Sequence, residues 1–312
     1  MNSKPNDTKS NWRTEELLKK SQSFSPELSK NTSLKYLLNL ADAEWVHIAP
    51  GKVVVTNNGR TWLYQPSFYE SRDCFTQPIK YSGSTVAIRQ LLDGAIAAAK
   101  FSISSSVRPP ALTRERWVWR LAGLYHQTHS IPQLMEKASQ GFAKVGCKNL
   151  AQWASQKACE EKGHDLLALQ DIQSLKYDAE EVVKTLVPPA AIALINYLTR
   201  SVQDLDPIDC VGYVYTMERL ALGIDRKYIQ KIEALLPSGT SATRCLRVHS
   251  NIGADAEHVE ETIEMLAGLT SEKLSRIVIA CYETALLCFS HPNAGYISNK
   301  ELQQILSSLK ST

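Results

Sequence analysis

The sequence lacks long apolar segments and blocks of like charge. No apolar run approaches the ~20 residues that a membrane-spanning helix needs, so we expect no membrane association. Residues 1–20 are polar and charged and contain no apolar core of a secretory signal. The 35 lysine and arginine residues are spread along the chain and nearly balance 32 aspartate and glutamate residues. A nucleic-acid partner is therefore not expected either.

Paired cysteines are also missing. The chain has seven cysteines, and none of them forms a Cys-x-x-Cys pair. An odd number of cysteines without an export signal is typical of reduced thiols and predicts a cytoplasmic location. The absence of a cysteine cluster also argues against a structural zinc site built from thiolates.

The N-terminal part of the chain differs in composition from the rest. Residues 1–33 are rich in Ser, Asn, Lys and Pro, and we expect them to form a flexible leader. Residues 34–80 contain short β-branched and aromatic runs separated by Pro-Gly and Asn-Asn-Gly turns, which predicts a small β-containing N-terminal region. This region could cover one end of the main domain or form a separate binding module.

Strand patterns nearly vanish after residue 85, and no internal repeat is visible. Proline and glycine divide residues 85–312 into segments with helical periodicity. The predicted helices cover residues 86–101, 113–124 and beyond, 132–144, 149–175, 178–186, 189–203, 207–222, 225–236, 240–266 and 271–289. The fold class predicted for residues 85–312 is therefore an all-α helical bundle.

Three segments carry candidate metal ligands. In the first, Glu161 and His164 form a Glu-x-x-His pair, a spacing that places a carboxylate and an imidazole on one face of a helix. Glu160 competes with Glu161 for the same role. The alternative is a solvated helix face, where such spacings arise by chance.

The second segment places Glu218 within a largely apolar and aromatic helix. A buried carboxylate is costly unless it is paired or binds a metal. Metal ligation, an ion pair with Arg219 or with a neighbouring helix, and exposure on the outer face remain open alternatives for Glu218.

The third segment is the densest in polar groups. Asp255 and His258 repeat the i, i+3 spacing with a shorter carboxylate, and His249 precedes them. Imidazoles together with carboxylates suit iron, zinc or manganese. The alternative is a polar helix start. The candidate metal ligands are Glu161, His164, Glu218, His249, Asp255 and His258.

The order of these segments resembles a known superfamily. The resemblance covers about residues 85–290 and rests on residues 125–134, 160–167 and 249–258 together with Glu218. These stretches are similar to the haem-oxygenase-like di-iron oxidases, which are relatives of thiaminase II, pyrroloquinoline-quinone synthase and the chlamydial death-domain-associated protein. The resemblance implies a haem-oxygenase-like helical bundle with two Fe(II) ions that activate dioxygen to oxidise a small organic substrate.

Ligand roles follow from the same resemblance. It implies that Glu161 and His164 bind one iron together with His258, that Glu218 bridges the two irons and that Asp255 holds the second. It is compatible with an external reductant and with a homodimer. Two other functions remain open: a metal-independent enzyme like thiaminase or the quinone synthase, and a non-catalytic binding protein with a degenerate metal site.

One position departs from the family pattern. The family places a histidine where this chain has Asn251, and the histidine here lies two residues earlier, at His249. On a straight helix of about 100° per residue, His249 and His258 would lie about 180° apart. His249 can therefore act as a ligand only if the helix bends between them, which Gly253 favours.

Other histidines, tyrosines and cysteines receive simpler interpretations. We expect His126 and His129 to be structural and the two cysteines nearest the candidate ligands, Cys159 and Cys245, to be buried small hydrophobes. Three tyrosines belong either to the core or to a substrate cavity: Tyr125, Tyr213 and Tyr215.

Overall fold

The computed structural model describes most of the chain from residue 43 onward. The described residues are 43–57, 59–65, 75, 83–103, 110–250, 255–290 and 297–311, and the side chains of residues 255 and 256 are not described. The predicted leader over residues 1–33 lies outside them, as do Asn251 and Gly253.

A small antiparallel sheet forms the N-terminal part of the described structure. Its strands β1 (Glu44–Ala49), β2 (Lys52–Asn57) and β3 (Arg60–Tyr64) pair in the order β1-β2-β3. Gly51 and Gly59 adopt positive φ angles in the two connecting turns, a conformation that glycine adopts at little cost. The three predicted strand segments are thereby confirmed.

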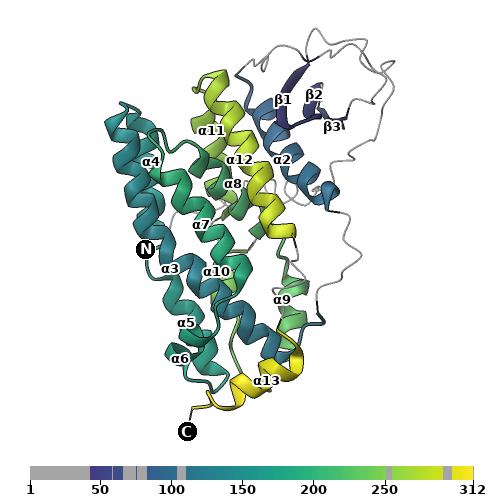
Figure 1. The fold of residues 1–312 in the computed structure, drawn as a ribbon, viewed down its shortest axis with the longest axis vertical. Coiled ribbons are helices and arrows are strands. Elements are labelled where there is room, and N and C mark those ends of the chain that lie inside the picture. Colours follow the sequence, from purple (N-terminus) through teal and green to yellow (C-terminus); the bar gives the residue numbers. More distant parts are fainter. Residues whose placement is uncertain are drawn as a thin grey trace, which may run out of the picture.

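The sheet packs on the helical part through one of its faces. Val46, Val54 and Leu63 belong to the same buried cluster as α2 (Thr85–Ser102). The residues that alternate with these along the strands, among them Val53 and Val55, point to the other face of the sheet and form a separate small cluster there. Figure 1 shows the sheet beside α2 and α12, at the end of the molecule opposite α13.

The remaining described elements are helices, which confirms the predicted all-α bundle with its small sheet. Helix α3 is the longest, begins after the Thr113 cap and continues through Pro132, where a separate helix was expected. The helices are α3 (Arg114–Lys144), α4 (Lys148–Glu160), α5 (His164–Ser174), α6 (Ala179–Thr185), α7 (Pro189–Gln203), α8 (Asp209–Ala221), α9 (Arg226–Glu233), α10 (Arg244–Val248), α11 (Asp255–Leu266), α12 (Ser271–Phe289) and α13 (Asn299–Ser307). The last of these had not been predicted.

Two expected helices are each broken in two. The segment predicted over 149–175 ends as α4 at Glu160 and restarts as α5 at His164, because Gly163 adopts a left-handed conformation with φ 84°. The segment predicted over 240–266 ends as α10 at Val248 and restarts as α11 at Asp255. The prediction of continuous helices was wrong at both places, and both breaks fall at candidate ligands.

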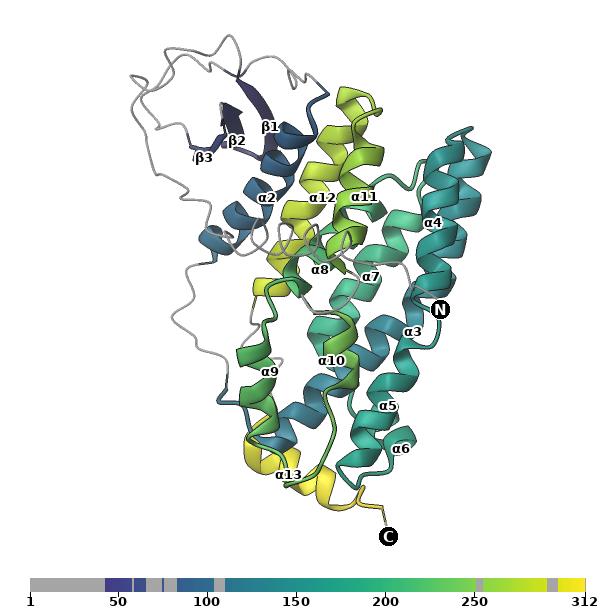
Figure 2. The same ribbon diagram turned by 180° about the vertical axis from the view of Figure 1, so that it is seen from behind.

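The bundle contains two apolar clusters. One surrounds α2, α8 and α12 and includes Phe142, Trp153 and Tyr215. The other joins the first half of α3 to α5, α6, α9 and α13 and includes Trp117 and Ile229. Figure 2 shows α9 and α10 on the same face of the bundle. Among the described residues, no single helix has the length and apolar character to cross a membrane; the pair α6–α7, bent by 77°, meets that test only when its helices are taken together.

Helices α8 and α12 approach so closely that only glycine fits between them. A Cβ atom added at Gly212 would lie 2.4 Å from the Ile277 carbonyl oxygen and 2.7 Å from the Ala280 Cβ. We expect Gly212→Ala to lower the free energy of unfolding by about 1–3 kcal/mol, because the two backbones must separate. Urea unfolding followed by circular dichroism measures this change.

Gly268→Ala is the matched control, since a Cβ there would meet nothing within 4 Å. Equal unfolding midpoints for the two variants would contradict the close contact of α8 and α12.

Candidate metal centre

Three predicted ligands converge from three helix ends. Glu161 caps the C-terminus of α4, His164 begins α5 and His249 caps the C-terminus of α10. One potential ligand atom from each lies within 4.8 Å of the others. His164 Nδ1 is 3.0 Å from Glu161 Oε2, and His249 Nε2 is 3.9 Å from the same oxygen. The two imidazole rings meet edge to face, with centroids 4.7 Å apart.

The helix breaks create this convergence. The turn at Gly163 lets the Glu161 carbonyl accept a hydrogen bond from the His164 backbone N–H at 3.3 Å, so the two side chains face each other across the junction. The end of α10 frees His249 from the straight-helix geometry that would have turned it away. This break between α10 and α11 agrees with the prediction that His249 can act as a ligand only if the helix bends between His249 and His258.

A buried aspartate anchors α10 to α5. Asp171, fully buried on α5, accepts hydrogen bonds from the Cys245 backbone N–H at 3.1 Å and from Arg244 at 2.9 Å. Because α5 also carries His164 at its first residue, this contact sets where His249 lies relative to His164. Sequence reasoning missed Asp171, which has no distinguishing motif.

Electrostatics favour the protonation states that bind metal. Burial opposes ionisation of Glu161, but the hydrogen bond from His164 and the neighbouring His249 outweigh it and lower the pKa of this carboxyl. Burial lowers the pKa of His249, and the charge of Glu161 only partly offsets this. The site therefore presents a carboxylate and a neutral imidazole. Nε2 of His249 has no hydrogen-bond partner among the described residues.

The donor set suits one non-haem iron ion. Two imidazoles and one carboxylate on one side of a metal are typical of Fe(II) oxygenase sites, where the remaining positions stay open. Iron bonds to nitrogen and oxygen are of similar length to the ~2.0–2.2 Å of zinc, so the observed spacing of the ligand atoms is close to what one ion spans.

A second group of acidic and imidazole side chains surrounds a lysine. Lys157 Nζ, which is buried, lies 2.9 Å from both Glu160 Oε2 and Glu218 Oε1. His258 lies beside them, with ring nitrogens 3.5 Å from Glu160 Oε2 and 3.9 Å from Glu218 Oε1. The pKa of Lys157 is raised, because Glu218 and Glu160 outweigh the effect of burial.

This arrangement shows which partners the three glutamates have. Glu218 makes the ion pair with a neighbouring helix that was one of its alternatives, and Arg219 pairs with Asp93 instead. Glu160 and Glu161 take different partners, one in the lysine group and one in the histidine group. The Asp255 side chain is outside the description, so its predicted role stays a prediction.

The two groups are electrostatic neighbours. The charge of His258 lowers the pKa of His249, and the charge of Lys157 lowers the pKa of Glu161. Tyr213 is fully buried, and burial, the Cys288 thiol and Glu161 all raise its pKa. Its hydroxyl has no hydrogen-bond partner in the part of the chain that the structure describes. Tyr215 instead donates to Asp93 from the core.

The remaining predicted histidines have their side-chain partners outside these two groups, and the remaining predicted cysteines differ in burial. His126 bonds to the Leu186 carbonyl at 3.1 Å, and the exposed His129 pairs with Asp165 at 2.7 Å. Cys245 is buried, which raises the pKa of its thiol to about 12. Cys159 is exposed, so the prediction that it is buried was wrong: it lies on the outer face of α4, whose other face carries Lys157.

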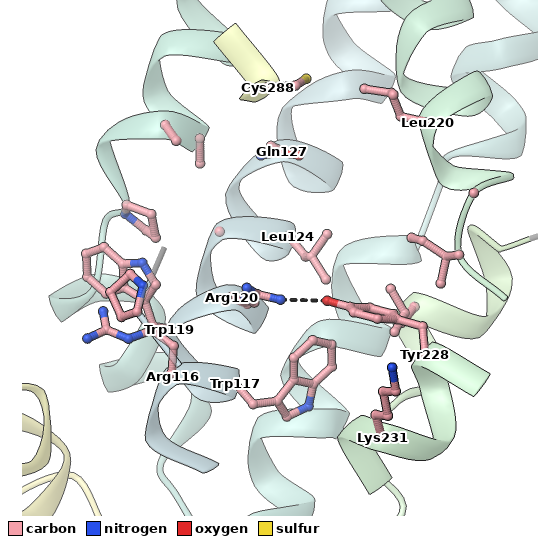
Figure 3. A pocket seen from close by; sticks show the side chains of 18 of the residues that line it. Arg116, Trp117, Trp119, Arg120, Leu124, Gln127, Leu220, Tyr228, Lys231 and Cys288 are labelled. Atoms are coloured by element: carbon pink, nitrogen blue, oxygen red, sulfur yellow. Dashed lines mark hydrogen bonds between the residues drawn. The ribbon is translucent and has the colours of Figure 1, made fainter. Parts of the chain in front are cut away.

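A cavity of about 790 Å³ lies between α3, α9 and the start of α7. Its lining includes Leu246, which lies one turn before His249, and Cys288, whose charge contributes to the raised pKa of Tyr213. Figure 3 shows Cys288 and Leu220 at one end and Trp117 and Lys231 at the other. Sequence reasoning missed this cavity, because its walls come from segments far apart in the chain.

Comparisons with known proteins identify the fold. A crystal structure of a domain of unknown function with a haem oxygenase-like fold, from Shewanella denitrificans, matches with a TM-score of 0.52 and 21% identity over 71% of this chain and 89% of that one. A TenA homologue from Pseudomonas syringae pv. tomato matches with a TM-score of 0.49 and 14% identity over 73% of this chain and all of that one. No family model and no curated protein matches the sequence. The chain thus has a haem oxygenase-like fold.

The lowered pKa of His249 predicts a pH dependence of stability. Since the folded state favours the neutral imidazole, His249 contributes stability above its ordinary pKa of 6.5 and loses it as the pH falls through the folded value. In EDTA, we expect the unfolding free energies of the natural protein and of His249→Gln to converge as the pH falls from about 7.5 to 5. Urea titrations across this range measure it, and parallel curves would contradict the assignment.

Proposed function

We propose that the protein is a non-haem-iron oxidoreductase that uses dioxygen to oxidise a small organic substrate. The observation that carries the proposal is the convergence of Glu161, His164 and His249 from three helix ends. The haem oxygenase-like fold is compatible with it but does not by itself specify a function.

The side chains around the site have distinct tasks in this proposal. Iron held by Glu161, His164 and His249 would supply the redox chemistry with dioxygen and keep open positions for it. The Glu161 carboxylate provides the negative charge that balances the cation. The buried phenol of Tyr213 keeps its proton, because burial raises its pKa.

Lys157 bears on the number of irons. Its ammonium lies between Glu160 and Glu218 and close to His258. The resemblance would make Glu218 the bridge between two irons and would place His258 on the iron bound by Glu161 and His164. A second cation could use these groups only if the lysine moved away, because two like charges repel strongly in a buried site. We therefore propose that one iron binds at the histidine group and that Lys157 takes the place of the other.

Metal analysis tests both parts. Anaerobic Fe(II) titration should saturate at about one iron per chain, and His164→Gln should abolish binding, because a carboxylate and one imidazole hold iron weakly. Removing the ammonium in Lys157→Met should raise the capacity toward about two irons per chain. His47→Gln, which alters an exposed histidine of strand β1, is the matched control.

The outcomes separate the two parts. No iron binding by the natural protein would refute the oxidoreductase proposal and leave the metal-independent enzyme and the binding protein with a degenerate site. Two irons in the natural protein would refute the role of Lys157 and leave iron dependence standing. Oxygen consumption by the iron-loaded protein then tests the redox activity.

A further inference from the structure

The cavity lined by α3 and α9 has the size of a small-molecule site. Its volume of about 790 Å³ falls in the range of about 300–1,000 Å³ that is typical of ligand pockets. Figure 3 shows that Arg120, Leu124 and Gln127 line its middle part from α3, with Tyr228 and Lys231 opposite on α9.

The lining carries an excess of positive charge. Arg120, Lys227 and Lys231 all line the cavity, and no carboxylate of a described residue lies within ion-pair distance of any of them. Arg120 Nη1 donates to the Tyr228 hydroxyl at 2.6 Å, which holds the guanidinium in place (Figure 3). The acidic residue of the lining, Asp225, caps α9 by accepting from the Tyr228 backbone N–H at 2.7 Å.

The same cavity has apolar and aromatic walls. The indole N–H of Trp117 donates a hydrogen bond to the Ala242 carbonyl at 2.7 Å, so the ring presents only an apolar surface to the cavity. Leu124 and Leu246 add aliphatic surface. A ligand with an apolar or aromatic body can therefore be buried here while its charged group meets Arg120 and Lys231.

The cavity leads toward the candidate metal centre. Leu246 lies on α10, one turn before His249, and Cys288 lines the end remote from Lys231 (Figure 3). Helix α8, which carries Glu218 of the lysine group, also contributes Leu220 to this end of the cavity.

We propose that this cavity binds an organic anion, a carboxylate or phosphate monoester with an apolar or aromatic body. Its anionic group binds at Arg120 and Lys231, and its body extends toward Leu220 and Cys288 at the other end of the cavity. As a statement about the substrate it rests on the proposed function, but binding of the anion does not require iron.

Matched probes test the proposal on the metal-free full-length protein. Tryptophan fluorescence titrations compare 2-naphthoate, its neutral analogue 2-naphthamide, and acetate, which lacks the aromatic body. We expect saturable binding of 2-naphthoate, at least about tenfold weaker binding of 2-naphthamide, and none of acetate at the same concentrations, since losing one hydrogen bond to a charged group has about this effect. 2-Naphthyl phosphate then distinguishes the phosphate from the carboxylate class.

Variants locate the anion site. Arg120→Gln should weaken 2-naphthoate binding by about tenfold or more and leave 2-naphthamide unchanged, whereas Arg120→Lys should keep part of the preference. Arg226→Gln, an exposed arginine on α9 outside the lining, is the control for net charge. Unchanged thermal unfolding of the variants shows that they are folded.

Equal affinity for 2-naphthoate and 2-naphthamide, no binding of 2-naphthoate, or an Arg120→Gln variant that binds like the natural protein would each overturn the proposal. Iron binding without naphthoate binding refutes the anion pocket alone. Naphthoate binding by a protein that takes up no iron in the anaerobic Fe(II) titration refutes the oxidoreductase proposal alone.

Discussion

Buried negative charge is the constraint on which the centre of this molecule depends. Glu160, Glu161 and Glu218 lie largely out of solvent between α4, α5 and α8. Carboxylates so placed must be paired with cations or bind a metal, because leaving them unpaired in a poorly polarisable interior costs several kcal/mol. Lys157 compensates Glu160 and Glu218. Glu161 faces two imidazoles: His164 Nδ1 lies within hydrogen-bond distance at 3.0 Å, and His249 Nε2 lies at 3.9 Å.

The histidine group depends on how the backbone is held, as well as on its ligands. Gly163 ends α4 and turns the chain so that Glu161 and His164 face each other. Asp171 then holds the start of α10 against α5, which brings His249 to the same place. Both devices are outside the set of ligand atoms, yet each fixes the geometry that a metal would require.

In the proposed function, the cavity binds the substrate and the candidate metal centre carries out the chemistry. The cationic and aromatic walls are contributed mainly by α3 and α9, whereas the candidate ligands come from α4, α5 and α10. In such a division, binding energy gained at one end of a substrate can position its other end. Leu246 lines the cavity on α10, one turn before His249, and so connects the two regions.

The sequence by itself determined the elements and the kinds of ligand. Helical periodicity, the Thr113 cap and the Pro-Gly and Asn-Gly turns act locally, so the bundle and the three strands could be predicted from them. Only the tertiary structure decided that α4 and α5 separate at Gly163, that His249 turns inward and that Lys157 lies between two glutamates. These features depend on which groups from distant segments are buried together, and the local pattern of one segment carries no record of its neighbours across the core.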